Sequence, residues 1–95
     1  MSKTIRSLSE MDGRVYVYLA NSAIGEKFLQ QAEQEGFTFG DGEKPTRRHY
    51  AELMAINHNL TINYVGFIGR MAYGSGAKTM GNEKLIRIDF EKYIS

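Results

Sequence analysis

The sequence predicts one α+β domain, in which a long helix packs on a mainly antiparallel sheet of four to five strands in β-α-β-β-β-β order. One segment repeats its apolar residues with the 3.6-residue period of a helix. Several shorter segments alternate apolar and polar residues with the period of two that is typical of strands. The length of 95 residues suffices for one hydrophobic core and excludes a second domain.

Composition and charge narrow the class of protein. Hydrophobic residues make up 42% and charged residues 24%, as in ordinary globular domains. The chain has no cysteine, which excludes disulfides and thiolate metal sites and fits a reducing cytoplasm. A net charge of +1 argues against nucleic acid as a partner. No apolar run is long enough for a signal peptide or a membrane span, so we expect a cytoplasmic protein without membrane contact.

The first part of the chain divides into an arm and a strand. Residues 1–13 are polar and aperiodic, and we expect a loosely ordered N-terminal arm before a single domain at 14–95. Residues Arg14 to Leu19 alternate aliphatic and aromatic side chains, which predicts the first strand.

The clearest helix signal lies at residues 23–35. Asn21 or Ser22 can cap its start, and Gly36 supplies the left-handed residue that commonly ends a helix. The stripe that should face the sheet consists of Ile24, Phe28, Leu29 and Ala32.

The remaining strands follow in the second half. Residues 36–40 predict a short strand, and residues 51–73 a hairpin whose second arm runs from Thr61 to Tyr73. That arm is long for a strand, so Gly66 and Gly69 are expected to mark bulges or a bend.

The C-terminal part begins with a loop at residues 74–82. A last strand follows at 85–90, with Ile86, Ile88 and Phe90 pointing inward.

No catalytic constellation is recognisable. His49 and His58 lack neighbouring carboxylates at a ligand spacing, and Ser75 has no convincing base. We therefore expect no catalytic residues, no metal and no cofactor.

Cationic residues near glycines and aromatics are the best candidates for binding. Residues 44–50 are the densest basic stretch, and the glycine-rich loop at 74–78 ends in a lysine. Guanidinium groups make two-pronged contacts with phosphate or carboxylate, and loop N–H groups can hold an anion. The alternative is that both segments are solvent-exposed loops without a binding role. We expect these two segments to combine in one functional surface. The predicted ligand- or partner-binding residues are Arg47, Arg48, Tyr50, Arg70, Tyr73, Ser75 and Lys78.

Four segments taken together, at residues 15–21, 36–42, 44–46 and 61–66, give the chain a resemblance to known proteins. The sequence resembles small uncharacterised accessory proteins of phages and mobile elements of Gram-positive bacteria. Such proteins often act by binding, as inhibitors of host defence or as regulators. The resemblance carries over no catalytic residues.

Two functions remain open. The first is a non-enzymatic binding protein that inhibits a host protein such as a defence component. The second is a homo-oligomer that binds a small anionic ligand such as a nucleotide and thereby sequesters a signal.

Overall fold

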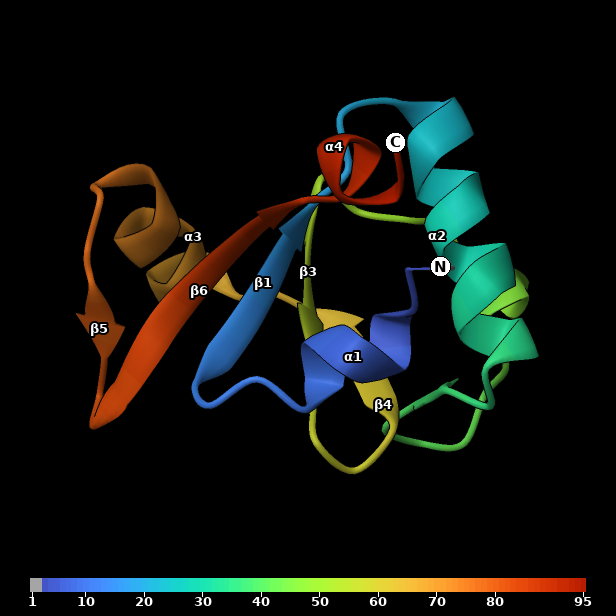
Figure 1. Cartoon of the computed structure of the whole chain (residues 1–95), viewed down its shortest axis with the longest axis horizontal. Helices are drawn as coiled ribbons and strands as arrows, with labels where there is room; N and C mark the ends of the chain where they lie inside the picture. The colour runs from blue at the N-terminus through green and yellow to red at the C-terminus, as the bar shows by residue number, and fades with distance from the viewer. Residues whose placement is uncertain (1–2) are drawn as a thin grey trace.

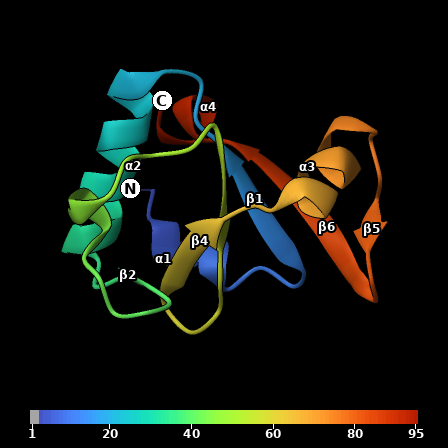
Figure 2. The same cartoon turned by 180° about the vertical axis from the view of Figure 1, so that it is seen from behind.

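The computed structural model describes residues 3–95 and has a six-stranded mixed sheet with helices on both of its faces (Figures 1 and 2). The strands are β1 (Arg14–Tyr18), β2 (Thr38–Phe39), β3 (Leu53–Ile56), β4 (Thr61–Tyr64), β5 (Thr79–Met80) and β6 (Glu83–Asp89). The helices are α1 (Ile5–Ser9), α2 (Ser22–Gln34), α3 (Phe67–Gly74) and α4 (Phe90–Ile94), with a 3₁₀ turn η1 (Pro45–Arg47).

The strand order is β2-β4-β3-β1-β6-β5. β1 lies in the middle, antiparallel to β3 and parallel to β6, and β2 is parallel to β4. The α+β class is confirmed. The finer expectation, one long helix on a mainly antiparallel sheet of four to five strands, is wrong: within residues 3–95 there are six strands, mixed pairing and four helices.

The main core lies between one face of the sheet and helices α1, α2 and α4. Val15 and Val17 of β1 are buried there together with Phe28 of α2. The ring of Phe28 meets that of Phe90 edge-on, with 5.2 Å between the centroids. Because Phe90 opens α4, this contact joins the C-terminal helix to α2.

Helix α2 forms where the sequence predicts it. The Asn21 side chain accepts a hydrogen bond from the N–H of Ile24 at 3.0 Å, and Gly36 has the left-handed φ of 90°. Of the predicted stripe, Phe28, Leu29 and Ala32 are buried and Ile24 is half-buried. The capping signals and the apolar period are local, which explains why this element was predictable.

The segment expected as a loosely ordered arm contributes helix α1 to the core within its described residues. Ile5 and Leu8 are 0% and 2% exposed. The Glu35 carboxylate at the end of α2 accepts hydrogen bonds from the N–H groups of Ile5 and Arg6, at 2.9 and 2.8 Å. Helix α1 is therefore packed and tied to α2, while residues 1 and 2 lie outside the described chain.

The second arm of the predicted hairpin is not one long strand. β4 ends at Tyr64 and the chain turns into α3, with Gly66 at the N-cap position. The expected loop at 74–82 contains the short strand β5, which pairs with β6. The last strand reaches Asp89, whose side chain caps α4 by accepting from the N–H of Lys92.

Within residues 3–95, no helix combines the length and the apolar content needed to cross a bilayer.

Candidate functional site

Helix α3 carries large apolar side chains that the rest of the described chain leaves exposed. Phe67 is 77% exposed, Ile68 is 74% exposed and Met71 is 58% exposed. They lie on the side of α3 that points away from the sheet, because Gly69, Ala72 and Tyr73 occupy the opposite side. Figure 2 shows α3 on the face of the sheet opposite α1. We call Phe67, Ile68 and Met71 the α3 patch.

A glycine lets α3 approach the sheet closely. A Cβ at Gly69 would lie 2.8 Å from the Tyr16 hydroxyl oxygen and 2.6 Å from a methyl group of Val65. Tyr16, on the second face of β1, is only 5% exposed, and its hydroxyl donates to the Met80 sulfur at 3.1 Å. The contact at Gly69 therefore fixes which side of α3 faces the sheet and which faces outward.

Arg87 of β6 holds the other end of α3. Its guanidinium donates at 3.1 to 3.3 Å to the backbone carbonyls of Ala72 and Tyr73 in the last helical turn, which also accept from the N–H groups of Ala77 and Gly76. The guanidinium also lies 5.2 Å from the centroid of the Tyr73 ring. Burial raises the pKa of the Tyr73 hydroxyl above its usual range, and the nearby positive charge of Arg87 offsets part of that rise. The helix is thus anchored at both ends.

A groove of about 880 Å³ runs beside the α3 patch on the same face of the molecule. Phe67 and Ile68 form its α3 side. Asn57 and Asn63 on the hairpin also line it, and the Asn57 side-chain N–H donates to the side-chain Oδ1 of Asn63 at 2.7 Å.

Charge in the groove is neutralised internally. Arg14 and Glu83 both line it, and the Arg14 Nε lies 2.7 Å from a carboxylate oxygen of Glu83. The groove therefore combines an apolar side, an amide side and a paired charge.

Three of the predicted binding residues, Arg47, Arg48 and Tyr50, line a second pocket of about 430 Å³ between α2 and η1. The Tyr50 ring packs on Gly25 of α2, where a Cβ would come within 2.2 Å of the ring. Arg47 is exposed.

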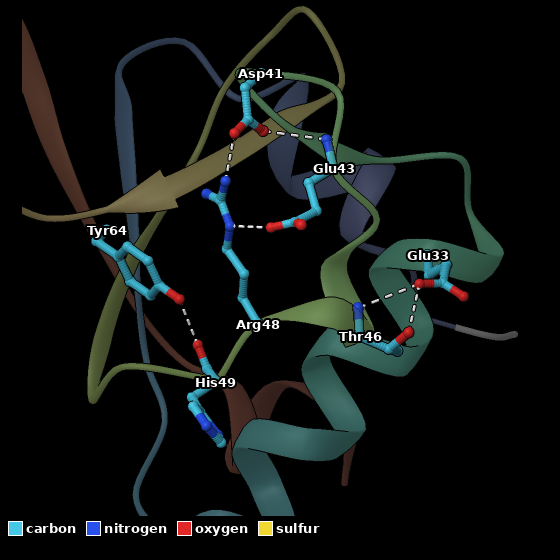
Figure 3. A network of polar contacts seen from close by, with 7 residues as sticks. All are labelled: Glu33, Asp41, Glu43, Thr46, Arg48, His49 and Tyr64. Atoms are coloured by element: carbon cyan, nitrogen blue, oxygen red, sulfur yellow. Dashed lines mark hydrogen bonds and ion pairs between the residues drawn. The ribbon is translucent and has the colours of Figure 1, made fainter.

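Arg48 is already bound within the chain (Figure 3). Its Nη2 and Nε contact the carboxylates of Asp41 and Glu43, and its guanidinium lies 4.4 Å from the centroid of the Phe39 ring. The expected pair of free guanidinium groups at 47 and 48 is therefore reduced to Arg47.

The other predicted residues lie on α3 and the loop that follows it. Arg70 and Lys78 are exposed, Tyr73 is half-buried against Arg87, and the Ser75 hydroxyl donates to the Ala72 carbonyl at 3.1 Å. Both cartoon views place this region at the opposite end of the sheet from α2 and η1 (Figures 1 and 2). The structure does not bring the two cationic segments together into one surface.

Sequence reasoning missed the α3 patch. Its residues were assigned to a strand, where alternate side chains would have been buried. The available signal was the number of aromatic residues, six tyrosines and five phenylalanines, which is more than so small a core can hold but does not say where the exposed ones lie.

No protein family, curated protein or solved structure matches this chain. Among the described residues, no three His, Asp or Glu side chains lie close enough together to hold a metal ion. The site must therefore be interpreted from its own chemistry.

Proposed function

We propose that this chain is a non-enzymatic protein-binding module, and that the α3 patch with its adjoining groove is the surface that binds a polypeptide. The observation that carries the proposal is the exposure of Phe67, Ile68 and Met71 on an anchored helix. Contiguous exposed apolar side chains on a soluble domain typically mark an interaction site.

The chemistry of the surface favours a polypeptide over a phosphate-bearing ligand. Two guanidinium groups at this surface are already used, Arg14 by Glu83 and Arg87 by backbone carbonyls, which leaves Arg70 as the exposed arginine of α3. A nucleotide or nucleic acid needs free cations to neutralise its phosphates. A protein partner instead supplies apolar side chains for the patch and backbone or amide groups for Asn57 and Asn63.

The identity of the biological partner stays a prediction. The resemblance to accessory proteins of phages and mobile elements implies a host protein, which the chain would inhibit by binding. The alternative of a small anionic ligand would use the α2–η1 pocket, where Arg47 is exposed.

Photo-crosslinking from within the patch tests the proposal. We would replace Phe67 by the photoreactive analogue benzoylphenylalanine, which keeps the aromatic ring, in a Gram-positive bacterial host. The matched control carries the same analogue at Ala23, an exposed position of α2. We expect light-dependent adducts with a polypeptide from position 67 and none from position 23. Equal labelling at both positions, or no polypeptide adduct from position 67, would overturn the proposal.

A further inference from the structure

We infer that the polypeptide bound by the α3 patch is a second copy of this chain, in a two-fold dimer where Phe67 and Ile68 of each copy enter the groove of the other. This inference rests on the proposed function, that the patch binds a polypeptide. It assigns the patch to a second copy, so a host protein would be bound through another surface of the dimer.

The shape of the surface suits a two-fold interface. Phe67 and Ile68 project from the molecule and also form one side of the groove, so the projection and the hollow lie next to each other. In a two-fold interface the same surface meets itself, and residue i of one copy contacts residue j of the other in both directions. A surface with a projection beside a hollow can satisfy this rule without any other partner.

The volume of the groove and the area of the α3 patch suit a two-fold interface. The groove volume of about 880 Å³ falls within the ~300–1,000 Å³ of pockets that enclose a drug-sized ligand, which leaves room for two large side chains. Phe67, the aromatic residue of the patch, can bury ~150–250 Å², and Ile68 and Met71 add apolar surface beside it. A standard interface buries ~800 Å² on each partner. The patch and the groove must therefore both be used.

Charge also permits self-association. Arg14 and Glu83 neutralise each other in the groove, so two copies that meet there do not bring unpaired charges together. A strongly charged partner would find no complement in this pair. Arg70 is exposed on α3 and can remain in water at the rim, where most interfaces are polar.

A membrane is the main rival for an exposed apolar helix with a basic neighbour. A bilayer surface can take up Phe67 and Ile68, but it leaves the groove beside them unfilled. The groove therefore favours a shaped protein partner, and vesicle binding becomes an outcome of the test.

Sedimentation of the whole chain measures the predicted dimer. The chain mass is 10.8 kDa, and we expect a species of twice that mass that dissociates on dilution. Ile68→Glu places a carboxylate in the interface and should weaken dimerisation on the order of tenfold or more. Ala23→Glu adds the same charge on α2 and should leave it unchanged. Circular dichroism must show that both variants are folded, and if Ile68→Glu is not, Ile68→Gln replaces it.

Disulfide trapping tests the geometry. The chain has no cysteine, so introduced thiols are the only ones present. A mixture of an Ile68→Cys chain with an Asn63→Cys chain should give more disulfide dimer than either chain alone, because position 68 of one copy lies in the groove of the other. If the Ile68→Cys chain alone gives as much disulfide dimer as the mixture, the α3 helices of the two copies contact each other instead. That result would overturn the arrangement in which Phe67 and Ile68 enter the groove.

The outcomes separate the two proposals. If the chain stays monomeric up to millimolar concentration while position 67 still crosslinks to another polypeptide, the dimer is wrong and the protein-binding function stands. If position 67 crosslinks to no polypeptide and the protein floats with vesicles of phosphatidylglycerol and phosphatidylcholine, both are wrong.

Discussion

The Tyr16 hydroxyl lies directly beneath Gly69, 2.8 Å from the place where a Cβ at that position would be. This contact joins the middle strand of the sheet to the helix that carries the α3 patch. Because Gly69 and Arg87 fix the helix from the sheet side, Phe67 and Met71 are held outward rather than free to fold onto the sheet.

We predict that Gly69→Ala destabilises the fold although alanine favours helices. The added methyl group would lie 2.6 Å from Val65 and 2.8 Å from Tyr16, and overpacking costs ~1–3 kcal/mol against a propensity gain of about 1 kcal/mol. Gly74→Ala is the matched control, since no atom lies within 4 Å of its added Cβ, and it should be neutral or stabilise by up to ~1 kcal/mol. Urea unfolding measures the free energy of unfolding of both variants and so tests the prediction. Equal stability of the two would show that α3 does not press on Tyr16.

A second prediction concerns Glu35, which joins the end of α2 to the start of α1. Its carboxylate accepts from the Ile5 and Arg6 N–H groups, and its backbone carbonyl accepts from the Arg6 Nε at 3.0 Å. Glu35→Ala should cost ~1–3 kcal/mol of unfolding free energy, because donors at the start of α1 lose their partner.

Hydrogen exchange shows which part of the fold Glu35→Ala destabilises. The amides of residues 5–9 should exchange faster in Glu35→Ala, while those of β1 change only with global stability. Glu26→Ala, at an exposed position of α2, is the control and should stay within ~0.5 kcal/mol of the parent. Unchanged protection of Ile5 would show that burial alone holds α1.

The difference between α2 and α3 shows what the sequence could predict. Helix α2 has a capping asparagine, one buried stripe and a terminal glycine, and all three signals lie within the segment itself. Helix α3 begins at Phe67, its N-cap residue Gly66 has no side chain to cap it, and its large apolar residues are exposed. Its residues therefore match the alternation of a strand better than the period of a buried helix. The contact that favours the helix is the packing of Gly69 on Tyr16, and Tyr16 is too far away in the sequence for a local pattern to show it.

The order of the strands and the position of the candidate site could not be predicted from local sequence patterns for a related reason. The parallel pairing of β1 with β6 joins segments far apart in the chain, and no local residue specifies it. The two cationic segments were each located, but their separation depends on the order of strands. The pairing of Arg48 with Asp41 and Glu43 likewise arises from a loop conformation that spacing alone does not give.

A third prediction uses the pH dependence of Glu33. The Thr46 hydroxyl donates to the Glu33 carboxylate at 2.7 Å and the Thr46 N–H at 3.2 Å, which lowers the pKa of Glu33 below its ordinary value of 4.5 (Figure 3). A lowered pKa in the folded state means that this contribution to stability is present above pH 4.5 and is lost as the pH falls through the folded pKa.

Removal of the hydroxyl should reverse the largest single contribution to the lowered pKa of Glu33, while the hydrogen bond from the Thr46 N–H remains. Thr46→Val should raise the pKa of Glu33 toward its ordinary value, and Thr46→Ser, which keeps the hydroxyl, should leave it low. Titration of the Glu33 side-chain carbon by NMR measures both. If Thr46→Val leaves the pKa unchanged, the hydrogen bond from the hydroxyl does not persist in solution.

The last prediction separates the two adjacent arginines. Arg48 reaches two carboxylates through different nitrogens and stacks on Phe39, a combination that a lysine cannot copy because it presents one point charge. Arg48→Lys should therefore lower the melting temperature and loosen residues 41–48, whereas Arg47→Lys, at an exposed position, should not. The difference should shrink in high salt, since both carboxylates are partly exposed to solvent. Thermal unfolding of the two variants at low and high salt measures this difference. Equal melting temperatures at low salt would mean that the contacts of Arg48 contribute nothing to folding. Both guanidinium groups would then be free to bind a ligand.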